Sequence, residues 1–274
     1  MNHDRMGPIG VFDSGVGGLS VWREIARLLP HEDILYFADQ AHVPYGARPP
    51  AEILALTQAA VEWLLAQGAK IVVLACNTAT AAALPSLRQR WPDFPLVGME
   101  PAIKPASQKT QTGHVAVLAT PGTLSASRFT HLVERFAHGV QVYTLVGSGL
   151  VELVEQNQLT GAQVEARCRE IFAPVQHKPI DTLVLGCTHF PFLRQTLQKV
   201  LGDAVTLVDP APAVARQTKR LLQDKQLLRS GNASGTWRFV TTGPVEPFRA
   251  ALAHLVGHDF NLTTPDTSIH SLNW

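Results

Sequence analysis

Two cysteines stand in similar surroundings in the two halves of this sequence. Cys76 follows the apolar run 71–74, and Cys187, 111 residues later, follows the apolar run 182–185. Both runs are short and partly β-branched, which is typical of strands buried on both faces. Hydroxyl residues and a predicted helix follow each cysteine. A thiol at such a turn lies near the positive end of a helix dipole, which favours the thiolate.

Two thiols on opposite sides of one site suggest a specific chemistry. Inverting the Cα of an amino acid needs a base on one face and an acid on the other, and a thiolate and a thiol supply both. Neighbouring Asp, Glu and His side chains could tune their proton affinities. A lone cysteine would favour the interpretation of a small buried hydrophobe, but the repeated pattern does not. No lysine stands in a Schiff-base setting, so the sequence predicts no pyridoxal phosphate and no other cofactor.

The third cysteine, Cys168, lies in the predicted helix 162–175 between Arg167 and Arg169. We expect it to be inert, and its charged neighbours predict partial exposure. Three cysteines are too few for a disulfide framework, and their separations exclude C-x-x-C motifs. The sequence therefore predicts no metal site.

Composition narrows the class of protein. The chain has 274 residues, 23 basic and 22 acidic, with a net charge of +1 and no basic run. This balance argues against a nucleic-acid partner. Residues 1–7 are polar and no apolar run reaches membrane-spanning length, so we expect no membrane association and a cytoplasmic location.

A glycine-rich turn follows the first predicted strand. Asp13 and Ser14 precede Gly15-Val16-Gly17-Gly18, and residues 19–29 are predicted to be helical. Such turns bind anions, and Asp39 ends the next strand at the spacing of a dinucleotide fold. The third glycine of G-x-G-x-x-G is missing, however, and Asp13 would face the phosphates. Another interpretation is that Asp13 and Ser14 cap the helix.

Two further segments offer groups that could bind a ligand. The loop 39–46 carries His42, Tyr45 and Gly46, and loops of this composition often line a cleft. Asn77 and Thr78 present an amide and a hydroxyl at a predicted helix start, where a carboxylate could be held without arginine.

The whole pattern predicts an α/β protein with two related halves. Residues 113–122 can be laid over 7–15 at an offset of 106, which sets Thr120 against Ser14. We expect two similar, doubly wound domains with mainly parallel sheets and an active site in the cleft between them. The predicted domains are residues 1–99 with 209–261, and residues 100–208, followed by a polar C-terminal tail, 262–274. Residues 101–112 are predicted to be a crossover, and 123–137 and 192–201 to be helices.

Several motifs in combination resemble one family. They are 12–19 (FDSGVGGL), Asp39-x4-Pro44-Tyr45-Gly46, 75–79 (ACNTA), 153–155 (LVE) and 186–191 (GCTHFP). Together they resemble the glutamate racemases of the cofactor-independent aspartate/glutamate racemase superfamily, over essentially the whole chain.

The resemblance implies roles for individual residues. It implies that Cys76 deprotonates the D isomer and Cys187 the L isomer, with Asp13 and His189 assisting the thiols. Asp39 and Glu155 are further candidates, and the Leu-Val-Glu match favours Glu155 over Glu152. The resemblance implies substrate contacts from Asp13, Ser14, Tyr45, Gly46, Asn77, Thr78, Thr188 and His189. We add Thr120 to this set because the internal repeat aligns it with Ser14.

The resemblance also implies interconversion of L- and D-glutamate, which supplies D-glutamate for peptidoglycan. Aspartate racemases usually carry Glu at the position of His189, which favours glutamate. The alternatives are an aspartate or hydantoin racemase, a decarboxylase, and a two-domain ligand-binding protein without catalysis. A decarboxylase needs one cysteine and a binding protein needs neither. A homodimer and activation by a peptidoglycan precursor stay open.

Overall fold

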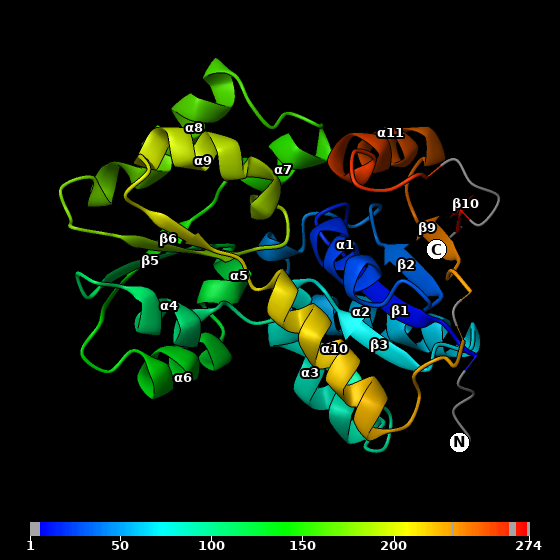
Figure 1. Cartoon of the computed structure of the whole chain (residues 1–274). Coiled ribbons are helices and arrows are strands. Elements are labelled where there is room, and N and C mark those ends of the chain that lie inside the picture. Colours follow the sequence, from blue (N-terminus) through cyan, green and yellow to red (C-terminus); the bar gives the residue numbers. More distant parts are fainter. Residues whose placement is uncertain (1–5, 232, 263–266, 273–274) are drawn as a thin grey trace.

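Two separate parallel sheets organise the chain (Figure 1). The structure is a computed structural model that describes residues 6–231, 233–262 and 267–272. The first sheet has the strand order β10-β9-β2-β1-β3-β4 and the second the order β6-β5-β7-β8. All pairings in both sheets are parallel.

The predicted repeat is visible in the strand orders. The order β2-β1-β3-β4 in the first sheet matches β6-β5-β7-β8 in the second, so β1 corresponds to β5 and β3 to β7. The expectation of two similar doubly wound units with parallel sheets is confirmed. The strands are β1 (Ile9–Asp13), β2 (Ile34–Ala38), β3 (Ile71–Leu74), β4 (Leu96–Gly98), β5 (His114–Ala119), β6 (Gln141–Val146), β7 (Thr182–Gly186), β8 (Thr206–Val208), β9 (Trp237–Thr241) and β10 (Thr267–Ser271).

Helices cover both faces of each sheet. Around the first sheet, α1 (Leu19–Leu28) packs on α10 (Ala211–Asp224) and α11 (Val245–Val256), and α2 (Pro50–Ala66) packs on α3 (Asn77–Arg90). Around the second, α4 (Ile103–Lys109), α5 (Pro121–Leu124) and α6 (Ser127–Phe136) form one group. The other group contains α7 (Leu150–Glu155), α8 (Ala162–Phe172) and α9 (Arg194–Leu201), with the short 3₁₀ turns η2 (Ala173–Val175) and η3 (Phe190–Leu193). A third 3₁₀ turn, η1 (Tyr45–Ala47), contacts α3 and α5.

The central strands are completely buried, as their apolar sequences predict. Every residue of β1, β2, β3 and β7 is buried. One apolar cluster runs from Val11 in β1 through Trp22 in α1 to Leu185 in β7, so it joins the two sheets. Burial of this kind is the main favourable term in folding.

Some sequence predictions were wrong in detail. The crossover 101–112 contains the helix α4; Pro105 lies in its first turn, where no backbone N–H is required. The predicted helix 123–137 is two helices, α5 and α6. The predicted helix 192–201 begins as the turn η3.

The prediction of a polar tail at 262–274 missed the strand β10, which pairs with β9 at the edge of the first sheet. Residues 263–266 and 273–274 of that tail, and residues 1–5, lie outside the described residues. We propose the two domain boundaries given above, after residues 99 and 208, since β4 and β8 end just before them, and β10 extends the first domain beyond residue 261.

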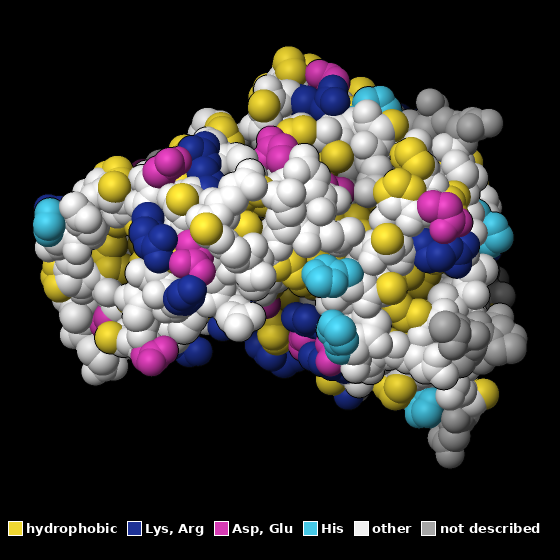
Figure 2. Space-filling model, turned by 90° about the horizontal axis from the view of Figure 1, so that it is seen from above, with side chains coloured by type: hydrophobic (Ala, Val, Ile, Leu, Met, Phe, Trp, Pro, Cys, Tyr) yellow, Lys and Arg dark blue, Asp and Glu magenta, His cyan; other side chains and the backbone are white. Residues whose placement is uncertain are grey.

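The surface carries mixed charge. Seen from above, Lys and Arg side chains lie beside Asp and Glu side chains (Figure 2), in keeping with the net charge of +1. Among the described residues, no helix has both the length and the apolarity needed to cross a membrane.

Candidate active site

Side chains from both sheets meet at the carboxyl ends of the strands. Asp13 ends β1, and Thr188 lies just beyond β7; the Thr188 hydroxyl donates to Asp13 Oδ2 at 3.0 Å. The hydroxyls of Thr78, in α3, and Thr120, at the start of α5, lie 2.8 Å apart. The hydroxyl of Ser20 donates to the Thr188 carbonyl at 2.9 Å. Ligands of α/β sheets bind at such strand ends.

Cys76 directly follows Ala75 at the end of β3 and is the N-cap residue of α3. Its sulfur accepts a hydrogen bond from the backbone N–H of Ala79 at 3.4 Å and lies 3.8 Å from the Ser14 hydroxyl. The side chain is buried, and burial together with the charge of Asp13 raises the pKa of the thiol to about 12. The expectation of a dipole-lowered pKa was therefore wrong for this thiol, because desolvation outweighs the helix terminus.

Cys187 follows β7 on the other side of the site. Its sulfur lies 3.6 Å from Nδ1 of His189. The residues after it form the turn η3, and α9 begins only at Arg194. The local partner of this sulfur is therefore an imidazole rather than the helix terminus that the sequence suggested.

The two thiols belong to one site and the third cysteine does not. Cys76 and Cys187 are 5 and 7% exposed, and the charge of Cys187 contributes to the raised pKa of Cys76. Cys168 is completely buried in α8, where it belongs to the large apolar cluster, and burial raises its pKa to about 11. The expectation that it is partly exposed was wrong: its arginine neighbours lie on the solvent side of α8, and the thiol faces the core.

A chain of polar contacts leads from Cys187 to Glu155 in α7. His189 Nε2 lies 2.7 Å from Glu155 Oε1, which also accepts the backbone N–H of Val16 at 2.8 Å. The second oxygen of Glu155 accepts a hydrogen bond from Gln40 at 3.0 Å. Burial lowers the pKa of His189, but its hydrogen bonds to Cys187 and Glu155 outweigh burial and raise it well above 6.5. Burial raises the pKa of Glu155, but the His189 contact reverses this and holds it below 4.5.

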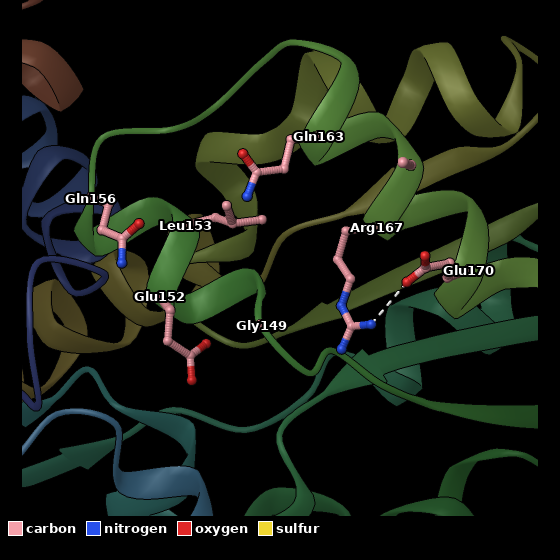
Figure 3. A pocket seen from close by; sticks show the side chains of 8 residues that line it. Gly149, Glu152, Leu153, Gln156, Gln163, Arg167 and Glu170 are labelled. Carbon is pink, nitrogen blue, oxygen red and sulfur yellow. Dashed lines mark hydrogen bonds and ion pairs between the residues drawn. The ribbon is translucent and has the colours of Figure 1, made fainter.

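Glu152, the alternative to Glu155, lies on another face of α7. It is exposed and lines a cavity of about 500 Å³ between α7 and α8, together with Gln156, Gln163 and Arg167 (Figure 3). Glu155 is the glutamate that reaches the thiol site.

The glycine-rich turn accommodates side chains from the second half of the chain. A Cβ at Gly15 would lie 1.9 Å from Glu155 Oε1, and a Cβ at Gly17 would lie 2.3 Å from His189 Nδ1. These two glycines are needed for the close approach of Glu155 and His189. A bound pyrophosphate would occupy the same space, which argues against the dinucleotide interpretation.

Asp13 is completely buried beside this turn. Its Oδ1 accepts the backbone N–H of Gly15 at 2.9 Å, whereas the N-cap of α1 is Gly18, without a side-chain cap. The capping interpretation was therefore wrong. Burial raises the pKa of Asp13 to about 6, although the positive charge of His189 opposes the rise.

In the loop 39–46, Asp39 contacts other residues of the loop and the residue that follows β9. Asp39 accepts hydrogen bonds from Tyr45 at 2.6 Å and from Thr242 at 2.9 Å, and lies 2.9 Å from Nδ1 of His42. Its contacts are thus with the loop and the end of β9 rather than with a thiol. A Cβ at Gly46 would lie 2.7 Å from that of Thr120, so Gly46 lets the two halves pack closely.

Asn77 is the polar group most clearly in need of a partner. It is 3% exposed, yet neither Nδ2 nor Oδ1 of its amide has a hydrogen-bond partner. A buried amide without partners costs free energy, so this one is available to a ligand or to water.

Sequence reasoning missed Gln40, Thr241 and Thr242, which stand behind the site. Gln40 occupies an unspecified position of the Asp39-x4-Pro44 motif, so the local pattern held no signal for it. Within the described residues no group of three or more His, Cys, Asp or Glu side chains could hold a metal ion.

The chain is similar to known proteins over most of its length. The family model described as Asp/Glu/Hydantoin racemase matches residues 9–218. A glutamate racemase of Pseudomonas aeruginosa is 49% identical over 91% of this chain and 94% of its own length. One from Roseiflexus is 46% identical over 93% of both chains.

Solved structures agree with these sequence matches. A glutamate racemase from Bacillus anthracis superimposes with a TM-score of 0.87 at 33% identity, covering 98% of both chains. The Escherichia coli glutamate racemase in complex with L-glutamate and the activator UDP-MurNAc-ala gives a TM-score of 0.83 at 35% identity, over 97% of this chain and 98% of that one.

The fold and these similarities thus define an amino-acid racemase. The chain belongs to the Asp/Glu/Hydantoin racemase family.

Proposed function

We propose that this protein is a glutamate racemase in which Cys76 and Cys187 act on opposite faces of the substrate Cα. The observation that carries the proposal is the position of the two buried thiols after the equivalent strands β3 and β7. The similarity to glutamate racemases over nine-tenths of the chain supports glutamate as the substrate.

The proton transfers balance without any cofactor. With L-glutamate, the Cys187 thiolate takes the Cα proton and becomes a thiol, and the bonding electron pair stays on carbon. The Cys76 thiol donates its proton to the opposite face and becomes a thiolate. The D isomer reacts in reverse, with Cys76 as base and Cys187 as acid.

The electrostatics of the site favour this starting state. The raised pKa of Cys76 keeps it as a thiol at neutral pH. The raised pKa of His189 provides a positive charge 3.6 Å from the sulfur of Cys187, the base in this direction of the reaction. Asp13 is hydrogen-bonded to Thr188 and raises the pKa of Cys76, so it assists the second thiol as base when the D isomer is bound.

Neutral donors hold the substrate carboxylates in this proposal. The candidate binding residues contain hydroxyls and one amide but neither Arg nor Lys: Ser14, Tyr45, Gly46, Asn77, Thr78, Thr120 and Thr188, with Asp13 and His189 beside them. The unpartnered amide of Asn77 supports a role in binding one carboxylate. Asp39 acts by positioning Tyr45, with which it shares a 2.6 Å hydrogen bond.

The cellular role follows from the product. D-glutamate is the peptidoglycan component that such an enzyme supplies, and we propose a cytoplasmic location for it. The Escherichia coli glutamate racemase binds the nucleotide-linked activator UDP-MurNAc-ala. By analogy we propose that a peptidoglycan precursor activates this protein. We also propose that it forms a homodimer.

Circular dichroism tests the activity directly. Purified protein without added pyridoxal phosphate should abolish the signal of L-glutamate and of D-glutamate, while L-aspartate stays nearly unchanged. Equal rates on aspartate would contradict the substrate, and a strict need for pyridoxal phosphate would contradict the mechanism.

A further inference from the structure

Gln40, in the loop after β2 of the first sheet, is hydrogen-bonded to Glu155, the carboxylate that contacts His189. It lies directly after Asp39 in the loop that follows β2, and its Nε2 donates to Glu155 Oε2 at 3.0 Å. Glu155 is 115 residues away, in α7 of the second half. The contact therefore joins the two halves of the protein at the active site.

The orientation of the Gln40 amide is fixed by its second partner. The hydroxyl of Thr241, at the end of β9, donates to Gln40 Oε1 at 2.8 Å. That hydroxyl accepts the backbone N–H of Gly243 at 3.0 Å, so its own proton is directed towards Gln40. The oxygen of the amide thus faces Thr241, and its NH₂ group faces Glu155.

The packing around Gln40 is tight. Thr241 is completely buried, and a Cβ at Gly243 would lie 2.9 Å from the Cβ of Gln40. A glycine at position 243 is required for this approach. The side chain of Gln40 is therefore held between β9 and α7 rather than free to rotate.

We infer that Gln40, oriented by Thr241, is a positioning residue that holds Glu155 in place against His189 and thereby tunes the Cys187 half of the reaction. Glu155 Oε1 is shared between His189 and the backbone N–H of Val16. Gln40 binds the other oxygen, so both ends of the carboxylate are fixed. Without Gln40 the carboxylate could rotate away from the imidazole.

The charged surroundings make this contact sensitive to the type of side chain at position 40. Glu155 faces His189 directly, with Asp13 and Tyr36 as the other titratable groups that interact with it. Asp39 is next to Gln40 in sequence, but it is engaged by Tyr45, His42 and Thr242. A second carboxylate at position 40 would repel Glu155 unless it carried a proton.

The inference rests on the proposed function, and two variants test it separately. Gln40→Met removes the donor at similar length and should lower kcat/KM for glutamate about tenfold at all pH values. Gln40→Glu should be nearly as active as the wild type at low pH, where its protonated carboxyl still donates to Glu155. Its kcat/KM relative to the wild type should fall as pH rises through the pKa of the new carboxyl. Thr241→Val should resemble Gln40→Met, and Thr241→Ser should restore activity.

The control is Gln58→Met, which removes a comparable Gln-to-Glu hydrogen bond, to Glu62 at 3.1 Å, from the surface of α2. It should leave kcat/KM unchanged. Wild-type protein that fails to racemise glutamate would overturn the proposed function. Active wild type with Gln40→Glu and Gln40→Met variants that keep the wild-type rate and pH profile would overturn only the role of Gln40. A pH-independent ratio for Gln40→Glu, with a lowered melting temperature, would show a merely structural role and also overturn it.

Discussion

Asp13, at the end of β1, and Thr188, just beyond β7, share a hydrogen bond of 3.0 Å although they are 175 residues apart and the two strands belong to different sheets. The bond links a completely buried carboxylate, whose charge raises the pKa of Cys76, to the residue that follows Cys187. Burial raises the pKa of Asp13 to about 6, so this group changes charge within the range where the protein can be assayed.

The pH dependence of activity should reflect the ionisation of the Asp13 carboxyl group. If its carboxylate is the form that assists the thiols, kcat/KM should rise with pH through about 6. Asp13→Asn should lose most of the activity together with this rising limb. If Asp13→Asn still shows the rise of kcat/KM with pH, the rise is due to the ionisation of another group.

The ionisation of Asp13 should also make stability depend on pH. The free energy of unfolding should fall over the pH range in which activity rises. Its pKa is 3.8 in the unfolded chain and about 6 in the folded one, so the folded state binds more protons between these values. Stability is therefore lost as pH rises from about 4 to 6, by about 3 kcal/mol. The unfolding free energy of Asp13→Asn relative to the wild type should increase by a comparable amount over this range. Urea unfolding at a series of pH values measures it.

Single Cys→Ser changes should separate the two thiols. Serine is a far weaker acid, so Cys76→Ser and Cys187→Ser should both lose racemisation in both directions. A substrate analogue with a leaving group on Cβ needs only proton abstraction. Cys76→Ser should still eliminate from the L analogue and Cys187→Ser from the D analogue, measured by release of the leaving group. The same isomer preference in both variants would point to a single base.

Cys168→Ser is the control for these variants. Because Cys168 is completely buried within α8 rather than at a strand end, kcat/KM should be unchanged. Burying a hydroxyl in the apolar cluster should nevertheless cost about 1 to 3 kcal/mol of unfolding free energy. Loss of activity in a stable Cys168→Ser protein would contradict its placement outside the site.

Gly17→Ala should displace the imidazole of His189. The added Cβ would lie 2.3 Å from His189 Nδ1 and 2.6 Å from the Thr188 hydroxyl, so both side chains must move. Misplacement of a catalytic group by about 1 Å costs roughly a hundredfold in rate, and we expect a loss of kcat/KM of that size. Full activity would show that the turn adjusts without moving His189.

Gly68→Ala provides the matched control. Gly68 ends α2 with a φ of +80°, and no atom lies near its added Cβ. The substitution should cost about 1 kcal/mol of stability through backbone strain and leave kcat/KM unchanged.

Much of the fold was predictable because strands and helices have strong local signals. The bounds of β3 agree with the apolar run 71–74 of the sequence prediction, since an apolar run and the turns beside it define a strand locally. The strand β10 was not predictable in this way. Its sequence, Thr-Ser-Ile-His-Ser, is mostly polar, and its strand conformation depends on pairing with β9.

The site was predictable where one motif carries the chemistry and not where distant segments meet. The two cysteines and His189 stand in recognisable turns. The function of Gly15 and Gly17 depends on Glu155 and His189, which are more than 130 residues away, so the local pattern suggested an anion site instead. Gln40 was missed for the same reason. The exposure of Cys168 was mispredicted because charged neighbours in sequence point to the other side of a helix.

Deuterium incorporation in D₂O tests the two-thiol account most directly. L-glutamate is incubated with cofactor-free protein, and both isomers are analysed by mass spectrometry early in the reaction. The account predicts D-glutamate deuterated at Cα, because the Cys76 thiol has exchanged with solvent, and remaining L-glutamate that still carries its original proton. A product that retains the substrate proton, or deuterium appearing equally in both isomers from the start, would contradict it.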